Sequence, residues 1–221
     1  MKIRSKTELL EAIQQDKVWR FKELINLRGA IQCSRKSNKN ILLRSGVLLL
    51  YAHWEGFVKN SCQYYFRYLN HKSIKYSELT LNYRALGIPY QFESNNFPSN
   101  NFSAFYKAAD FIKNPQNHGI FRVDVDKIST QSNLNTEVMI GLLNMIGLDS
   151  QFITNHHHHI DERLLKYRNA IAHGENTSFS TDYDITEVSF SDLYERIKAL
   201  IDEFESRLTN HFECENFMVS A

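Results

Sequence analysis

The chain has 221 residues, of which 43% are hydrophobic and 23% charged, and its formal net charge is +1. Three prolines and eight glycines exclude a collagen-like or linker-rich chain, and the length suffices for one well-packed domain. The longest apolar run, residues 46–52, is too short to span a bilayer, and the N-terminus lacks the apolar segment of a secretory signal. We therefore expect a single domain over residues 1–221, in the cytoplasm, with Cys33, Cys62 and Cys214 reduced.

Charge is distributed unevenly along the chain. Residues 1–44 carry eleven Lys or Arg against four Asp or Glu, whereas residues 182–221 carry three against ten. A basic N-terminal part could attract phosphates. Alternatively, the two ends lie on separate solvated faces or pair with each other. The sequence leaves both alternatives open.

Hydrophobic periodicity predicts two helices in the first third of the chain. Residues 7–28 have apolar side chains near helical spacing, with Thr7 as the cap, and a polar, basic connection is expected over residues 29–40. Residues 41–71 lack proline and are apolar on two sides of a helix. A helix of that kind is central to a bundle, so residues 41–71 are predicted to be the central helix.

The middle of the chain has a weaker pattern. Residues 73–155 include an Asn- and Ser-rich stretch, 93–103, that has no strong period. A shorter helix is expected over residues 136–145, with cap candidates in residues 132–135. We interpret residues 73–155 as an irregular insertion between two helices of one bundle.

Two further helices are predicted near the C-terminus. The first covers residues 160–173, and Gly174 ends it. The second covers residues 190–212, with Ser189 and Asp192 as a capping box. Together, the four main helices predict an all-α, antiparallel helical bundle.

The helix expected over residues 160–173 carries a polar set near its end. On a wheel of about 100° per residue, Arg168 lies beside the apolar stripe, whereas Asn169 and His173 face away from it. Asn169 and His173 are four residues apart and therefore lie one turn apart. The apolar stripe consists of Ile160, Leu164, Tyr167 and Ile171.

This polar set suits the cleavage of RNA without a metal. A histidine can take the proton from the 2′-hydroxyl, because its side chain titrates nearest neutrality. An arginine supplies a fixed positive charge for the transition state at phosphorus, and an asparagine can orient the substrate or the imidazole. Because Arg168 and His173 point in different directions on one helix, two such helices across a twofold axis would form the site.

The segment 168–173 reads R-x4-H with Asn directly after the Arg, and it resembles the signature of the HEPN superfamily of helical domains. Residues 49–60 read LLYAHWEGFVKN and resemble an early helix of the RiboL-PSP-type HEPN-like nucleases. Residues 132–134 and 146–149 resemble the same subgroup. R-x4-H occurs by chance in many proteins, but its position after the 49–60 motif makes the resemblance specific over about residues 41–175.

The resemblance implies an all-α domain that acts as a homodimer and cuts RNA without a metal or cofactor, leaving a 2′,3′-cyclic phosphate. It also implies a toxin or phage-defence effector that is restrained by a partner protein. Arg168, Asn169 and His173 match the motif, and Glu55 and Lys59 match charged positions of the earlier helix. Some HEPN domains lack nuclease activity, so a nucleotide- or partner-binding module is the alternative.

Several of these residues also have plain structural interpretations. Glu55 and Lys59 could form an ordinary ion pair four residues apart, and His53 is expected to be a solvated polar group. Residues 156–159 are four consecutive histidines, of which at most His156 and His159 could share a metal ion. We expect a solvated segment there rather than a metallohydrolase.

Overall fold

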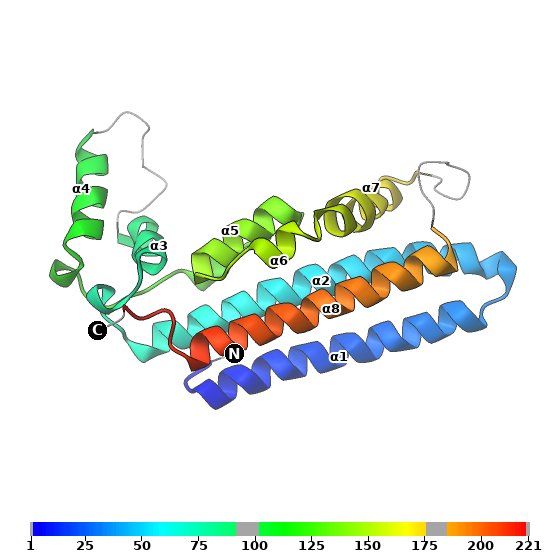
Figure 1. Ribbon diagram of the computed structural model, residues 1–221, viewed down its shortest axis with the longest axis horizontal. Helices are drawn as coiled ribbons and strands as arrows, with labels where there is room; N and C mark the ends of the chain where they lie inside the picture. Colours follow the sequence, from blue (N-terminus) through cyan, green and yellow to red (C-terminus); the bar gives the residue numbers. More distant parts are fainter. Residues whose placement is uncertain (1, 92–101, 176–184, 220–221) are drawn as a thin grey trace.

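The computed structural model describes residues 2–91, 102–175 and 185–219 (Figure 1). Its long elements are helices throughout these ranges, which confirms the all-α prediction. The α-helices are α1 (Lys6–Cys33), α2 (Lys36–Lys72), α3 (Leu81–Gln91), α4 (Phe102–Lys113), α5 (Thr136–Ile146), α6 (Gln151–Thr154), α7 (Lys166–Ala172) and α8 (Glu187–Glu213). A π-helix, His158–Leu165, leads directly into α7, and 3-10 turns lie at Tyr76–Glu78, Pro115–Asn117 and Val125–Lys127.

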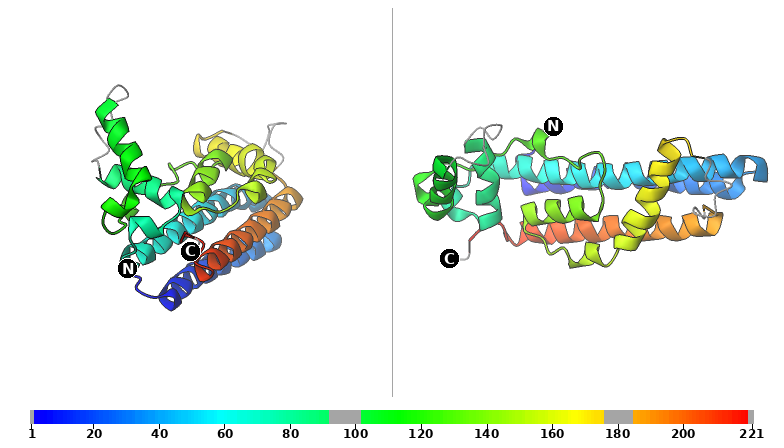
Figure 2. Two further views of the ribbon diagram at one scale, coloured as in Figure 1. Left: turned by 60° about the vertical axis from the view of Figure 1, so that its left-hand side comes forward. Right: turned by 90° about the horizontal axis from the view of Figure 1, so that it is seen from above.

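The three longest helices, α1, α2 and α8, lie side by side along the molecule, and α5, α6 and α7 cover α2 and α8 from one side (Figures 1 and 2). Helix α1 runs antiparallel to α2 and α8. Helices α2 and α8 run in the same direction. Lys39 near the start of α2 pairs with Glu187 at the start of α8, and Lys72 at the end of α2 pairs with Glu215 just after the end of α8. Helix α7 runs back against α2, which brings its end toward the start of α2 (Figure 1).

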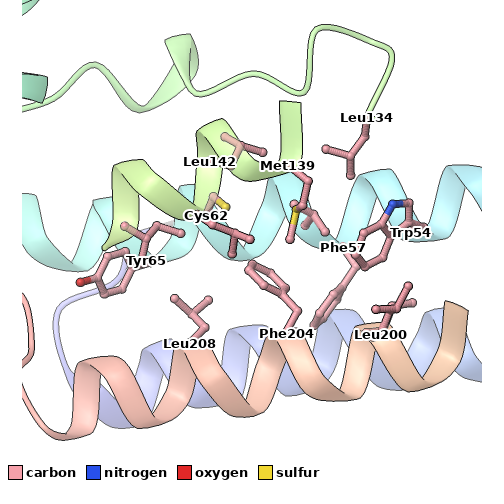
Figure 3. Packing of buried hydrophobic residues seen from close by; sticks show 14 of the residues in the cluster. Trp54, Phe57, Cys62, Tyr65, Leu134, Met139, Leu142, Leu200, Phe204 and Leu208 are labelled. Carbon is pink, nitrogen blue, oxygen red and sulfur yellow. The ribbon is translucent and has the colours of Figure 1, made fainter. Parts of the chain in front are cut away.

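Helix α2 is the centre of the core, as its two apolar sides predicted. Trp54, Phe57 and Tyr65 of α2 are completely buried. Figure 3 shows side chains of α8 approaching α2 from one side and side chains of α5 from another. Phe57 meets Phe204 of α8 edge to face, with 6.2 Å between the ring centroids. Burial of aromatic area on this scale is the main stabilising contribution to a bundle.

The prediction of a non-helical connection over residues 29–40 is wrong. Helix α1 continues to Cys33, and α2 begins at Lys36, so the polar, basic residues form helical turns. Ile31 explains the extension, because it is 1% exposed and packs against Gly46 of α2. Burial of Ile31 in the core stabilises the helical conformation beyond Gly29, where local propensity alone would end it.

Two predicted caps are also shifted. Ser5, rather than Thr7, caps α1, and its hydroxyl accepts a hydrogen bond from the backbone N–H of Glu8 at 3.1 Å. At α8 the cap is Thr186, and Ser189 is the third helical residue of a capping box with it. The predicted capping box began at Ser189, three residues after the observed cap.

The region 73–155 is more regular than we expected. Its described residues include α3, α4, α5 and α6 and the 3-10 turns at Tyr76–Glu78, Pro115–Asn117 and Val125–Lys127. Helix α5 matches the helix predicted over 136–145, and Asn135 caps it by accepting from the backbone N–H of Val138 at 2.8 Å. Most of the Asn- and Ser-rich stretch 93–103 lies outside the described residues.

A buried polar network joins α2, α3 and α8. The Tyr65 hydroxyl lies 2.7 Å from that of Tyr83, and the Tyr83 hydroxyl lies 3.0 Å from His211 Nε2 and donates to the carbonyl of Ile146. The Tyr83 hydroxyl has a single proton, so Tyr65 and His211 Nε2–H are the donors to it, and the proton of the neutral imidazole lies on Nε2. Burial lowers the pKa of His211 to about 4, so the neutral form is the stable one in the fold.

The opposite charges at the two ends of the chain pair with each other. Lys17 of α1 lies 2.6 Å from Asp202 and 2.5 Å from Glu205 of α8, and Arg28 pairs with Glu195. Of the two alternatives for the charge asymmetry, the pairing of the ends therefore accounts for these residues. Among the described residues, no helix is both long and apolar enough to span a membrane.

Candidate active site

The end of α7 has a well-defined backbone geometry. Gly174 has φ +79°, its N–H bonds the carbonyl of Ile171 at 3.1 Å, and the N–H of Glu175 bonds the carbonyl of Ala170 at 2.9 Å. These two bonds form a Schellman motif, in which glycine tolerates the positive φ. The motif places His173 at the last position of the helix, where its side chain is exposed.

Arg168 is held on three sides. Its Nη1 donates to Asn169 Oδ1 at 2.7 Å, and its Nη2 donates to the carbonyl of Ser132 at 3.4 Å. Its guanidinium carbon lies 4.6 Å from the centroid of the Tyr51 ring on α2. The positive charge of α7 is therefore fixed between α2 and the segment that precedes α5.

That preceding segment is in turn bound to α2. Glu55 Oε1 accepts a hydrogen bond from Thr130 Oγ1 at 2.7 Å, and the Tyr51 hydroxyl accepts from the backbone N–H of Leu134 at 2.7 Å. Burial, and to a smaller extent the Glu55 carboxylate, raises the pKa of Tyr51 to about 12. Tyr51 therefore stays protonated near neutral pH and is not a general base.

Four of the five predicted site residues lie around the junction of α2 and α7. Arg168, Asn169 and Glu55 are half-buried there, and the exposed His173 follows Asn169 by one turn. Lys59 is exposed one turn beyond Glu55, and the described contacts include no ion pair between the two. We call Tyr51, Glu55, Arg168, Asn169 and His173 the motif cluster.

The wheel drawn from the sequence was wrong about Asn169. Asn169 is half-buried, and its Oδ1 accepts a hydrogen bond from Arg168 Nη1. The wheel assumed α-helical turns from Ile160 onward, whereas His158–Leu165 is a π-helix with wider turns, so angles counted across it do not apply to Asn169. His173 lies away from the core, as the wheel predicted.

The sequence reasoning missed three parts of this site: the Tyr51 ring, the Thr130 hydroxyl and the Ser132 carbonyl. Tyr51 could have been found, because it precedes Glu55 by four residues and so shares its helix face. The contacts of Thr130 and Ser132 depend on the path of a loop, which no periodicity reveals.

His53 corrects another prediction. We expected a solvated side chain, but it is 2% exposed and lies between α2 and α1. Its Nδ1 lies 3.4 Å from Arg20 Nη1, and its Nε2 lies 2.8 Å from Glu23 Oε2. Arginine can only donate, so His53 accepts at Nδ1 and is neutral with its proton on Nε2. Burial, followed by the charge of Arg20, lowers the pKa of His53 in agreement with this assignment.

His53 belongs to a buried ionic group on the opposite face of α2. Arg20 Nε donates to Asp16 Oδ2 at 2.7 Å, and Asn60 Nδ2 donates to Asp16 Oδ1 at 3.0 Å. Both partners of the Asp16–Arg20 pair have only 7% of their side chains exposed. We call Asp16, Arg20, Glu23, His53 and Asn60 the α1–α2 cluster.

The four consecutive histidines show no metal-ligand geometry. The rings of His156 and His159 have centroids 6.0 Å apart, and the exposed His157 pairs with Asp161 through an Nδ1–Oδ2 distance of 2.8 Å. Among residues 2–91, 102–175 and 185–219, no three His, Cys, Asp or Glu side chains are grouped as metal ligands would be. The histidines therefore supply no further site residues to the motif cluster.

The comparisons with known proteins agree with the geometry. A family model described as HEPN_MAE_28990-like HEPN matches residues 9–215, and so includes α1 and α8 in addition to the motif region. No curated protein and no solved structure matches the chain. The superfamily inferred from residues 41–175 is confirmed, while the likeness to the RiboL-PSP-type subgroup stays an expectation. With its family model matched over nearly the whole chain, this all-helical protein belongs to the HEPN superfamily.

Proposed function

We propose that this protein is an endoribonuclease that cleaves RNA without a metal, through Arg168 and His173. The observation that carries the proposal is the fixed guanidinium of Arg168 five residues before an exposed histidine at a helix end. A guanidinium held in place can stabilise the negative charge that develops at phosphorus in the transition state. The exposed imidazole is available to a substrate.

In this proposal His173 takes the proton from the 2′-hydroxyl, whose oxygen then attacks the adjacent phosphorus. The bond from phosphorus to the 5′-oxygen of the next nucleotide breaks, that oxygen leaves and takes up a proton from solvent, and a 2′,3′-cyclic phosphate remains on the other product. Arg168 contacts the phosphate oxygens. Asn169 orients the guanidinium, because its Oδ1 accepts from Nη1. Glu55 acts indirectly. It accepts a hydrogen bond from Thr130 and so fixes the segment whose Ser132 carbonyl binds Arg168. Lys59, exposed on the same side of α2, would contact the RNA backbone.

A homodimer completes the site in our proposal. Ile41 and Leu48 of α2 are 65% and 36% exposed, and Arg44 between them donates to the carbonyl of Glu175 at 3.0 Å. Spacings of three and four residues place these side chains on one helix face, beside the end of α7. An apolar face next to the motif would let a second copy bring its own His173 to the same phosphate.

The biological role that we propose is that of a toxin or phage-defence effector, restrained by a partner protein. This part rests on the superfamily alone, whose members often have such roles. It implies that unrestrained expression slows growth through loss of RNA.

The direct test is cleavage of RNA by the purified protein in EDTA. We expect products that end in a cyclic phosphate, and we expect Arg168→Ala and His173→Ala to lower the rate by about 100-fold or more. His157→Ala is the matched control, because His157 is also an exposed histidine close to α7. It should keep the wild-type rate. Full activity in either motif variant would reject the assignment.

The alternative, a HEPN module that binds without cutting, is separated by the same experiment. It predicts intact RNA together with a thermal shift caused by nucleotides or by a partner protein. Wild-type and His173→Ala protein would then behave alike in the cleavage assay.

The homodimer is tested by sedimentation velocity. Leu48→Asp places a charge on the exposed apolar face of α2, and we expect it to convert a dimer into a monomer and to abolish cleavage. Val188→Asp is the control, since Val188 is 80% exposed on α8, outside this face. A wild-type monomer that cleaves RNA would contradict the dimer.

A further inference from the structure

Tyr51 is in close contact with the motif arginine, although it carries no charge and was not among the predicted site residues. It is 3% exposed, its ring lies 4.6 Å from the guanidinium carbon of Arg168, and its hydroxyl accepts the N–H of Leu134. A guanidinium stacks on an aromatic face through cation–π attraction, which favours one orientation of the planar fork. Tyr51 thus contacts both the charge and the loop beside it.

The loop that Tyr51 holds is strained. Gln131 and Ser132 both have φ +55°, a left-handed backbone conformation that residues other than glycine seldom adopt. Such a conformation persists only where the surroundings fix it. Here Thr130 is bound by Glu55, and Leu134 is completely buried and bound by Tyr51. The strained turn directs the carbonyl of Ser132 to Arg168 Nη2.

We propose that Tyr51 is a positioning residue for Arg168: its ring aligns the guanidinium, and its hydroxyl anchors the turn whose Ser132 carbonyl accepts a second guanidinium hydrogen. The inference rests on the proposed function, because it concerns the orientation of a group that acts in the transition state. Alignment of this kind affects kcat rather than the binding of substrate. Tyr51 itself transfers no proton.

Two substitutions separate the ring from the hydroxyl. Tyr51→Phe keeps the stacking surface but loses the hydrogen bond from Leu134, and we expect kcat to fall by about threefold at most. Tyr51→Leu removes the ring, and we expect kcat to fall about tenfold or more while KM changes less than about threefold. The pH profile of the remaining activity should keep its shape, because Tyr51 does not titrate near neutrality.

Tyr68→Leu is the matched control. Tyr68 lies on the same helix, is also 3% exposed, and also has a cation over its ring, Lys72 Nζ at 5.8 Å. Its replacement should lower thermal stability as much as Tyr51→Leu does, without a change in kcat at temperatures where the protein is folded. An equal loss of kcat in Tyr68→Leu would overturn the inference, as would an equal loss in Tyr51→Phe and Tyr51→Leu.

A measurement without RNA keeps the inference separate from the proposed function. In ¹⁵N NMR spectra, the Nη signals of Arg168, assigned with Arg168→Lys, should be resolved by slow rotation in wild type and in Tyr51→Phe. They should average in Tyr51→Leu. Averaged signals in wild type would overturn the inference whether or not RNA is cut. If Arg168→Ala were inactive while Tyr51→Leu kept its kcat within about twofold, the inference alone would fail.

Discussion

The two sides of α2 carry polar clusters of similar composition in different surroundings. On the side of α1, the α1–α2 cluster combines an arginine, a histidine, two carboxylates and an amide, and Asp16, Arg20 and His53 are at most 7% exposed. On the side of α7, the motif cluster combines an arginine, a histidine, a carboxylate, an amide and a tyrosine. There Arg168 is half-buried and His173 is exposed.

The difference teaches how the same residue types serve two purposes. In the α1–α2 cluster the charges of Asp16 and Arg20 pair within α1, and the neutral His53 and Asn60 of α2 bind them, so the cluster fixes how α1 packs on α2. In the motif cluster the guanidinium is oriented by neutral groups, Tyr51, Asn169 and the Ser132 carbonyl. Its charge is therefore not cancelled and can attract an anion.

The largest effect that would test this contrast is on stability. Arg20→Ala leaves the Asp16 carboxylate buried without its main partner, and we expect the free energy of unfolding to fall by about 3–5 kcal/mol. Arg168→Ala removes a stacked, half-buried arginine, and we expect a loss of only about 1 kcal/mol. Urea denaturation measures both.

A double variant serves as the control. Asp16→Asn combined with Arg20→Met removes both charges, and we expect it to recover most of the loss because no uncompensated charge remains. Equal losses in Arg20→Ala and Arg168→Ala would show that the two clusters do not differ in the way described.

The second prediction concerns the stability of the fold at acid pH. The pKa of His211 in the fold is about 4, below the ordinary value of 6.5, so the unfolded chain binds the proton first as the pH falls. Stability is therefore complete above about pH 6.5 and decreases toward pH 4, by about 3 kcal/mol from this group. His53, whose pKa is also lowered, adds to the loss in the same direction.

Denaturation at a series of pH values measures this dependence, and His211→Gln isolates it. Glutamine can still donate to the Tyr83 hydroxyl but does not titrate, so the variant should lose most of the slope between pH 6.5 and 4. A slope in His211→Gln as steep as that of the wild type would contradict the assignment, whereas the smaller part contributed by His53 should remain.

The smallest effect concerns the close packing of α1 on α2. A Cβ added at Gly56 would lie 2.6 Å from Arg20 Nη1, and the ion pair with Asp16 restrains the guanidinium from moving away. We expect Gly56→Ala to cost about 1–3 kcal/mol. Gly141→Ala in α5 is the control, because nothing lies within 4 Å of its added Cβ. It should stabilise the protein by up to about 1 kcal/mol, as thermal melts would show.

The sequence was informative where burial is periodic. The stripes of residues 41–71 and 190–212 predicted α2 and α8 to within a few residues, and the R-x4-H motif located Arg168 and His173 at a helix end. It failed where contacts are polar and long-range. His53 lies off both apolar stripes of α2, and only the packing of α1 supplies the partners that bury it. Ser132 reaches Arg168 through a strained turn, which has no sequence signature of its own.

The π-helix before α7 determines the direction of the motif side chains. If His158–Leu165 took ordinary α-helical bonding at unchanged length, its turns would be tighter, and all later side chains would rotate around the helix axis. Arg168 would then leave the Tyr51 ring, although the spacing within R-x4-H would be unchanged. The orientation of the motif is thus encoded upstream of it, and an alignment that matches the motif alone can pair residues that point in different directions.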